Sequence, residues 1–332
     1  MIPFKRINLG NAYKEVKPLF DSGMIGLGDV VFQFEKELAE YLGARHVVAL
    51  DSCTSALFLS AKWEKGKEGV EKVVIPSMTV PLVADALIQA QMDFSLDART
   101  DWVGKYYRLT GSGIYDSAHE LRRNQFRKMK DAGAPDNLKL CFSFYPTKTV
   151  GSADGGAIAT DDDEFARWAR SACVYGRNQA QKRQNSWDYD IEFIGYKLHM
   201  TNLQAAIILE QLHRLDQTNA QRQLIADHYD KAFSYATGKV IHNDSDYLYR
   251  LNVKNRDEFI EHCLKNGVEC GVHFKPLHQF APFRDLKISE SDRIAVNEAY
   301  EKTVSLPLYD SLTPEEVAKV IDVVLQKKGD IL

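Results

Sequence analysis

The stretch VVALDSCTSALFLSAKW, residues 47–63, decides the fold: a short apolar run is followed by small polar residues and then by an amphipathic segment. The opening VVAL has the β-branched composition of a buried strand. From Ser55 to Trp63, apolar side chains recur at helical spacing, which predicts a helix that covers the sheet. Ser52 and Thr54 lie where this helix begins, a position that hydroxyl residues favour. Such a strand–turn–helix unit is typical of α/β proteins.

Five further apolar runs follow, separated by amphipathic stretches, and this alternation predicts an α/β domain. The runs are VVIP (73–76), FSLD (94–97), GIYD (113–116), LCFSF (140–144) and GAIAT (156–160).

The C-terminal third has a different pattern. TNLQ at 201–204 fits a capping box and predicts one long helix to about Phe233. The strand-like YLYRLNV (247–253) and the terminal helical run TPEEVAKVIDVVLQKK then predict a small α+β unit. We therefore expect a large domain over 1–235 and a small one over 236–332.

The composition excludes several classes of function. The 332 residues include 42 Lys+Arg and 46 Asp+Glu, a net charge of −4, which argues against nucleic acid as the partner. The N-terminus has no signal-peptide pattern and no apolar run is long enough to span a membrane, so we expect a cytoplasmic protein. Five cysteines without CxxC spacing predict neither a disulfide framework nor a metal site.

Two polar clusters follow predicted strands. DSCTSAL (51–57) opens a helix, and helix N-termini bind phosphate through unpaired N–H groups, although the same residues also suit an ordinary N-cap. Asp116 and His119 follow the GIYD run, where side chains line the ligand crevice of an α/β sheet. An aspartate in this place can also be a simple turn residue.

Two more clusters contain lysines. LCFSFYPTKTVGSADGGAIAT (140–160) carries Ser143 and Lys148 into a glycine-containing turn. Lysines are mostly solvated surface charges, but a lysine with a free amine can form a Schiff base. GYKLHMTNLQAA places Lys197 and His199 in a loop that precedes the capped helix, and a solvated loop is the alternative there.

Together these clusters match the requirements of one cofactor, pyridoxal 5'-phosphate. A helix start can hold its phosphate, a lysine can hold its aldehyde as an imine, and an aspartate can keep its pyridine nitrogen protonated.

The same residues resemble a known family. Over nearly the whole chain, the sequence is similar to the DegT/DnrJ/EryC1/StrS family of sugar aminotransferases, which are pyridoxal-phosphate enzymes of fold type I. The resemblance implies a mixed, mostly parallel sheet flanked by helices, with a small C-terminal α+β domain. It is carried by FEKELAEYLGARHVVALDSCTSAL, VVIPSMT, YDSAH, CFSFYPTK with its trailing GG, GYKLHMTNLQAAI, GVHFKPLH and SLPLYDSLTPEEV.

The resemblance implies roles for the residues around the cofactor ring. Lys148 matches the lysine that forms the internal aldimine and then acts as the base. Asp116 matches the carboxylate on the pyridine nitrogen. His119 matches the polar residue near the ring face and the phenolic oxygen.

Other implied roles concern the phosphate and the subunit arrangement. Cys53, Thr54 and Ser143 fall where the family binds the cofactor phosphate. Family members are homodimers, and Lys197 is similar to the residue that reaches the phosphate from the partner subunit.

The implied reaction is ping-pong transamination from an amino donor, commonly glutamate, to a keto sugar linked to a nucleotide. Arg177, His199 and His273 are candidates for binding the diphosphate of this substrate.

Two features depart from the family pattern. Val80 stands where an aromatic side chain commonly stacks on the cofactor, so that stack is weaker or comes from elsewhere. The stretch between Asp97 and Asp116 is several tens of residues shorter than in relatives, which implies the loss of at least one strand and one helix beside the cofactor.

These departures keep two alternatives open. One is a non-catalytic or degraded homologue that still binds pyridoxal phosphate and serves as a binding or assembly protein. The other is a related dehydratase that uses the same cofactor, although in that branch a histidine takes the place of Lys148.

Overall fold

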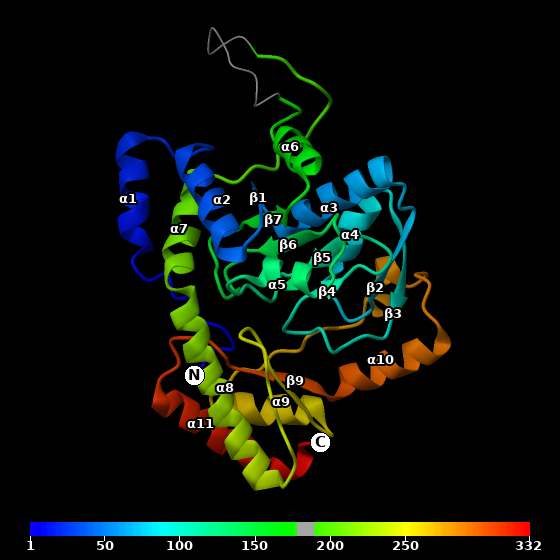
Figure 1. The fold of residues 1–332 in the computed structure, drawn as a ribbon. Helices are drawn as coiled ribbons and strands as arrows, with labels where there is room; N and C mark the ends of the chain where they lie inside the picture. The colour runs from blue at the N-terminus through cyan, green and yellow to red at the C-terminus, as the bar shows by residue number, and fades with distance from the viewer. Residues whose placement is uncertain (178–188) are drawn as a thin grey trace.

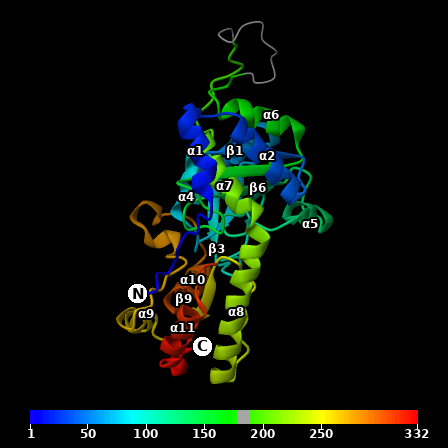
Figure 2. The same ribbon diagram turned by 90° about the vertical axis from the view of Figure 1, so that its left-hand side faces the viewer.

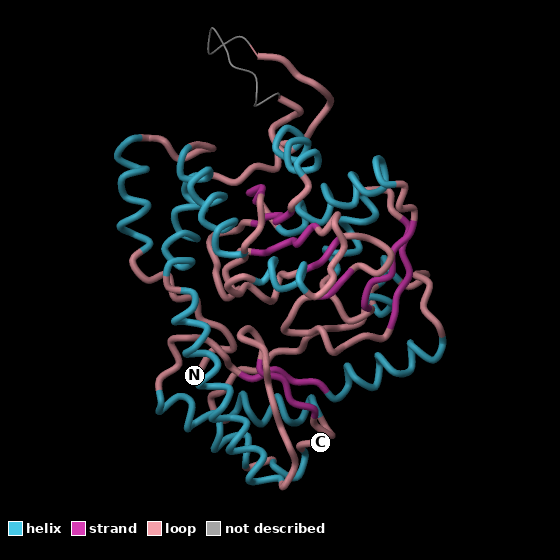
Figure 3. The backbone as a smooth tube through the Cα atoms, in the orientation of Figure 1, coloured by secondary structure: helices cyan, strands magenta, loops and turns pink. Residues whose placement is uncertain are grey.

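The computed structural model describes residues 1–177 and 189–332. The chain forms a larger lobe, in which strands lie between helices, and a smaller lobe, in which a pair of strands packs with the C-terminal helices (Figure 1). Figure 3 shows strands in magenta in both lobes. The strands are β1 (His46–Leu50), β2 (Lys72–Pro76), β3 (Asp93–Asp97), β4 (Tyr107–Arg108), β5 (Ile114–Asp116), β6 (Lys139–Ser143), β7 (Gly156–Thr160), β8 (Tyr249–Asn252) and β9 (Thr303–Leu306).

The main sheet has the order β1-β7-β6-β5-β4. β1, β5 and β6 run in one direction, whereas β4 and β7 run in the other. The six strands predicted in the first half of the sequence are confirmed, each to within one residue at either end. In the register, Leu50 and Ser143 both pair with Gly156, so the carboxyl ends of β1 and β6 meet at one edge. Polar residues that follow these strands are thereby brought together.

The helices cover both faces of the main sheet. Alternate residues of β1 belong to different clusters: Val48 and Leu50 pack with α3 and α4, whereas Val47 and Ala49 pack with α2 and α7. The helices are α1 (Ala12–Ser22), α2 (Asp29–Leu42), α3 (Cys53–Trp63), α4 (Pro81–Gln89), α5 (Gln125–Asp131), α6 (Asp163–Ala172), α7 (Asn202–His213), α8 (Leu215–Thr237), α9 (Arg256–Lys265), α10 (Glu290–Lys302) and α11 (Pro314–Leu325), with a π-helical turn at Glu64–Glu68 and 3-10 turns at Leu277–Gln279, Ala281–Phe283 and Lys328–Asp330.

The shortened stretch before Asp116 forms a small hairpin that the sequence did not predict. Its first strand, β4, pairs antiparallel with β5. Just beyond β4, Thr110 forms two backbone hydrogen bonds with Val74 on β2. The Thr110 N–H donates to the Val74 carbonyl, and the Val74 N–H donates to the Thr110 carbonyl, both at 2.9 Å. The hairpin therefore connects the main sheet to the parallel pair β2–β3 and fills the position between them.

The prediction of one long helix after residue 201 is wrong. The capping box at Thr201 and Gln204 is present, but α7 ends at His213 and α8 begins at Leu215. Between them, Arg214 has φ −110° and ψ 8°, and its guanidinium donates to Glu210 Oε2 at 3.1 Å and to a backbone carbonyl of the N-terminal segment. Figure 2 shows α8 running from the larger lobe down beside α11, where its second half joins the core of the smaller lobe.

No helix among residues 1–177 and 189–332 is both long enough and apolar enough to cross a membrane.

A buried ion pair stabilises the start of β6. Lys139 Nζ lies 3.2 Å from Glu64 Oε1 and 2.8 Å from Glu68 Oε1, and the side chains of Lys139 and Glu64 are fully buried. Replacing Lys139 with methionine leaves a carboxylate without its cation, so we expect the free energy of unfolding to fall by about 3–5 kcal/mol. Urea unfolding measures this change. Adding Glu64→Gln to the variant should recover some of the loss, and a Lys139→Met protein as stable as the wild type would contradict the prediction.

Candidate active site

The start of α3 forms one wall of the site. Ser52 caps this helix, as predicted, and its Oγ accepts from the Ser55 N–H at 3.1 Å. Cys53 and Thr54 are the first helical residues, and amides in a first turn have no partner within the helix. A Cβ on Gly156 would lie 2.2 Å from the Ser52 carbonyl carbon, so a glycine there lets β7 pass directly against the helix start. The result is a site suited to an anion such as phosphate.

Asp116 ends β5 and is 6% exposed. Its Oδ1 accepts from the Ala118 N–H at 2.9 Å, and its carboxyl group also accepts from the Tyr107 hydroxyl. Burial raises the pKa of Asp116, while the Ala118 N–H and the charge of Lys148 act in the opposite direction. A buried carboxylate is stabilised by a cation close to it. Asp116 is therefore suited to a protonated heterocyclic nitrogen.

His119 lies one turn beyond Asp116 and is also buried. Its Nδ1 accepts from the Gly104 N–H at 3.2 Å, and rings of Trp102, Tyr247 and Phe274 surround it. Burial lowers the pKa of His119 well below its usual range, and the nearby charges of lysine side chains act in the same direction. The imidazole is therefore neutral at physiological pH.

Lys148 lies in the turn between β6 and β7. Its backbone N–H donates to the Tyr145 carbonyl at 2.9 Å, and its Nζ lies 4.8 Å from the centroid of the Tyr247 ring. Ser143, the last residue of β6, lies on the same side of the sheet as this turn and lines the same cavity. The turn thus presents an amine next to the ends of two central strands.

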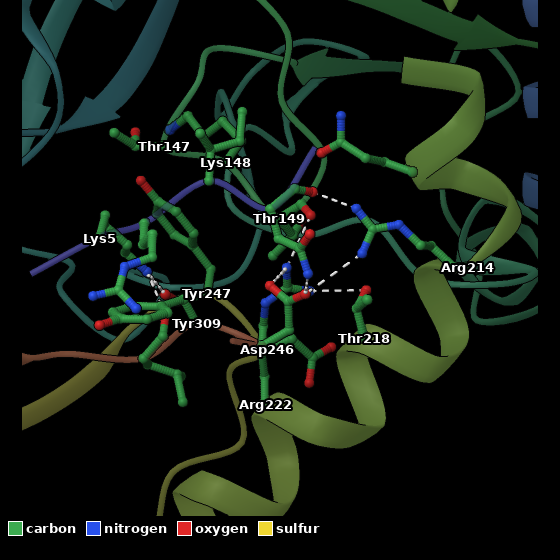
Figure 4. A pocket seen from close by; sticks show the side chains of 16 residues that line it. Lys5, Thr147, Lys148, Thr149, Arg214, Thr218, Arg222, Asp246, Tyr247 and Tyr309 are labelled. Atoms are coloured by element: carbon green, nitrogen blue, oxygen red, sulfur yellow. Dashed lines mark hydrogen bonds and ion pairs between the residues drawn. The ribbon is translucent and has the colours of Figure 1, made fainter. Parts of the chain in front are cut away.

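A polar cluster lies behind Lys148 (Figure 4). Lys5 donates to the Tyr247 carbonyl, and its Nζ lies 4.3 Å from the centroid of the same Tyr247 ring that Lys148 contacts. Arg222 on α8 donates to the Thr149 carbonyl at 3.1 Å. Burial lowers the pKa of Lys5, and the charges of Arg222 and Lys148 add to this effect. These contacts fix the lysine turn against α8 and the N-terminal segment.

One cavity of about 420 Å³ unites most of the predicted site residues. Its wall includes the residues predicted to bind the cofactor phosphate, to contact the cofactor ring and to form the covalent bond, together with His273. Burial lowers the pKa of His273 to about 3. Three predicted residues, Arg177, Lys197 and His199, do not line this cavity within the described residues of the chain. Those that do are Cys53, Thr54, Asp116, His119, Ser143, Lys148 and His273.

The loop that contains Lys197 and His199 runs along the edge of β1 that does not pair with β7, where His199 bridges Leu50. Leu198 accepts from the Asp51 N–H at 2.8 Å, and Lys197 forms a bridge with Val174. Arg177 lies on the surface nearby, where its guanidinium is 4.8 Å from the centroid of the Tyr189 ring. These three predicted residues are therefore close to one another but separate from their own chain's cavity.

The cavity also contains aromatic residues that the sequence analysis missed. Val80 lines it, and the rings of Trp102, Tyr247 and Phe274 line it as well. Trp102 comes from the shortened stretch, and the other two come from the smaller lobe of the molecule. No local pattern marks such residues, because each joins the site only through the tertiary fold.

The fold is α/β, with a mixed sheet between helices and the cavity at one edge of that sheet. The family model for DegT/DnrJ/EryC1/StrS aminotransferases matches residues 9–93 and 114–325, and the chain belongs to this family. The unmatched residues between these ranges, 94–113, comprise most of β3, the loop that follows it and β4.

Individual relatives match over nearly their full length. The spore coat polysaccharide biosynthesis protein SpsC of Bacillus subtilis is 30% identical, with 94% of this chain and 92% of that protein covered. A UDP-4-amino-4,6-dideoxy-N-acetyl-beta-L-altrosamine transaminase of Campylobacter jejuni is 25% identical, with coverage of 92% and 91%. The PLP-form structure of the putative sugar aminotransferase Spr1654 from Streptococcus pneumoniae has a TM-score of 0.77 at 22% identity, with coverage of 98% and 99%.

Proposed function

We propose that the protein is a pyridoxal-phosphate-dependent aminotransferase that moves an amino group from glutamate to a keto sugar linked to a nucleotide. The observation that carries this proposal is the single cavity in which Lys148, Asp116 and the start of α3 meet. Membership of an aminotransferase family supports the reaction type. The Campylobacter jejuni transaminase, named for a UDP-linked amino sugar, supports the substrate class.

The residues present fit the cofactor by the chemistry of their donors and acceptors. The first-turn amides at Cys53 and Thr54, with the Ser143 hydroxyl, would hold the phosphate. The buried Asp116 carboxylate would pair with the pyridinium nitrogen, and Lys148 would hold the group covalently. When bound, pyridoxal phosphate supplies an electron sink for the carbanion that forms on the substrate.

Lys148 would have a second role once an amino substrate has displaced it. Its Nζ then becomes a free amine that can take a proton from the substrate carbon and return it elsewhere, which is general acid–base catalysis. Nζ lies 4.8 Å from the centroid of the Tyr247 ring, and both residues line the cavity in which this transfer would take place.

The nucleotide sugar needs groups that bind its diphosphate. His273 lines the cavity and is a candidate, whereas Arg177 and His199 lie outside it and would act at the cavity of a partner subunit. We keep all three as candidates for this role.

We further propose a homodimer in which Lys197 reaches the partner's cavity. Two observations support this: Lys197 does not line its own chain's cavity, and Ile194 on the same loop is 96% exposed. Large exposed apolar side chains often mark subunit interfaces, and the segment from α1 to α2 has several. They are Tyr13, Phe20, Met24, Ile25 and Phe32.

Mixing two inactive variants tests this shared site. Consider a dimer of one Lys148→Ala subunit and one Lys197→Ala subunit. If Lys197 reaches the partner's cavity, the cavity of the Lys148→Ala subunit contains both changes. The cavity of the Lys197→Ala subunit then has both native lysines and is intact. Random assortment after co-expression should therefore restore about one quarter of wild-type activity. If Lys197 acts in its own chain's cavity, both sites of the mixed dimer are damaged, and no recovery would be seen.

The reaction itself is tested with isotope-labelled glutamate and a panel of UDP- and dTDP-linked keto sugars, analysed by mass spectrometry. We expect one sugar to lose its keto oxygen and gain the labelled nitrogen. A product that has lost water without gaining nitrogen would favour the dehydratase alternative. No change in any sugar would favour the non-catalytic alternative.

A further inference from the structure

The loop between β3 and β4, residues 98–106, makes two direct contacts with His119. The Gly104 N–H donates to His119 Nδ1 at 3.2 Å, and the Trp102 ring stacks on the imidazole with a centroid distance of 5.4 Å and an interplanar angle of 21°. Both residues lie between the two ranges that match the family model. These contacts are therefore supplied by the segment in which the chain departs from its family.

The Gly104 contact fixes the tautomer of His119. A backbone N–H can only donate, so Nδ1 must be an unprotonated acceptor, and the neutral ring must carry its proton on Nε2. Among the described residues His119 makes no other hydrogen bond, and its ring lines the cavity. The Nε2–H group is thus a donor that is left for a ligand.

The segment that makes these contacts is itself anchored. Ser245 Oγ donates to the Gly104 carbonyl at 2.7 Å, and Arg250 donates to the Thr100 carbonyl at 2.9 Å. Trp102 is 6% exposed and packs on Tyr107, with 4.4 Å between ring centroids. Because the loop is held from both sides, it presents the Gly104 N–H and the indole ring in one fixed arrangement.

We propose that Trp102 and Gly104 are positioning residues for His119. They hold the imidazole as the Nε2–H tautomer, so that this N–H is a donor available to an acceptor atom of a ligand in the cavity. This inference rests on the proposed function. The loop between β3 and β4, which the family model does not match, supplies both contacts.

A double-mutant cycle tests the proposal, with equilibrium binding of pyridoxamine 5'-phosphate as the readout. This probe cannot bond covalently to Lys148. We expect Trp102→Ala and His119→Ala each to weaken binding about tenfold, and the double variant to be no weaker than either. Trp102→Phe keeps a stacking ring and should retain most of the affinity. As a control, Trp168→Ala removes an indole of α6 that does not line the cavity, and should leave binding within about twofold of the wild type.

Nitrogen NMR of the His119 imidazole supplies a second readout, the tautomer of the ring. If Trp102 only stabilised the fold, replacing it would not change this tautomer. We expect the Nε2–H tautomer in the wild type. In Trp102→Ala we expect a mixture of tautomers, because the ring loses the stack that keeps its Nδ1 beside the Gly104 N–H. The inference would be overturned if the losses of binding free energy of the two single variants added in the double variant. An Nδ1–H tautomer in the wild type would also overturn it. Failure of the wild type to bind the probe at all would instead overturn the proposed function.

Discussion

Replacing Lys148 with alanine is expected to lower kcat for amino transfer by about 10³-fold or more, because the same amine both holds the cofactor and moves the substrate proton. The initial rate of 2-oxoglutarate formation from glutamate, with the preferred keto sugar in excess, measures this loss. The variant should fold normally, since Lys148 lies in a turn and its side chain is only partly buried.

Lys265→Ala is the matched control. This lysine has a side chain that is 71% exposed on α9, and its removal should leave kcat unchanged. If Lys148→Ala turned over at a rate close to that of the control, Lys148 would not be the catalytic amine.

Changing Asp116 to asparagine is expected to lower kcat by about 10²-fold or more. Asparagine has nearly the same shape and can still accept from the Ala118 N–H, but it cannot keep a pyridine nitrogen protonated. Affinity for the nucleotide sugar should change little, so the loss should appear in kcat rather than in KM. Steady-state kinetics at saturating cofactor separates these two parameters.

Asp136→Asn controls for the loss of an acid, because Asp136 has a fully exposed side chain and does not line the cavity. We expect wild-type kinetics for this variant. An Asp116→Asn protein with an unchanged kcat would mean that this carboxylate does not act on the cofactor ring.

Much of the fold could be predicted because its signals are local. The runs that form β1 and β7 are short and β-branched or small, and they lie between amphipathic helices. β4 could not be predicted, since it has only two residues and is defined by its antiparallel pairing with β5. The helix break at Arg214 was missed for a similar reason, because its contacts are with residues distant in sequence.

The residues of the site also divide into those that local sequence signals predict and those that only the tertiary fold brings in. Asp116, Ser143 and Cys53 could be predicted because each follows or ends a strand, and strand ends gather at one edge of the sheet. Trp102 and Tyr247 could not, because a loop residue joins a cavity only through long-range packing. Cavity positions for Arg177 and His199 came from the resemblance, and the geometry of a single chain does not place them there.

The most direct test of the central claim is the visible absorbance of protein purified with pyridoxal phosphate. We expect the wild type to show a band from the covalently attached cofactor, and glutamate to abolish it as the amino group is transferred. The same band should be absent from Lys148→Ala. A wild type without the band, or a band that persists both in Lys148→Ala and after addition of glutamate, would contradict the assignment of a lysine-dependent aminotransferase.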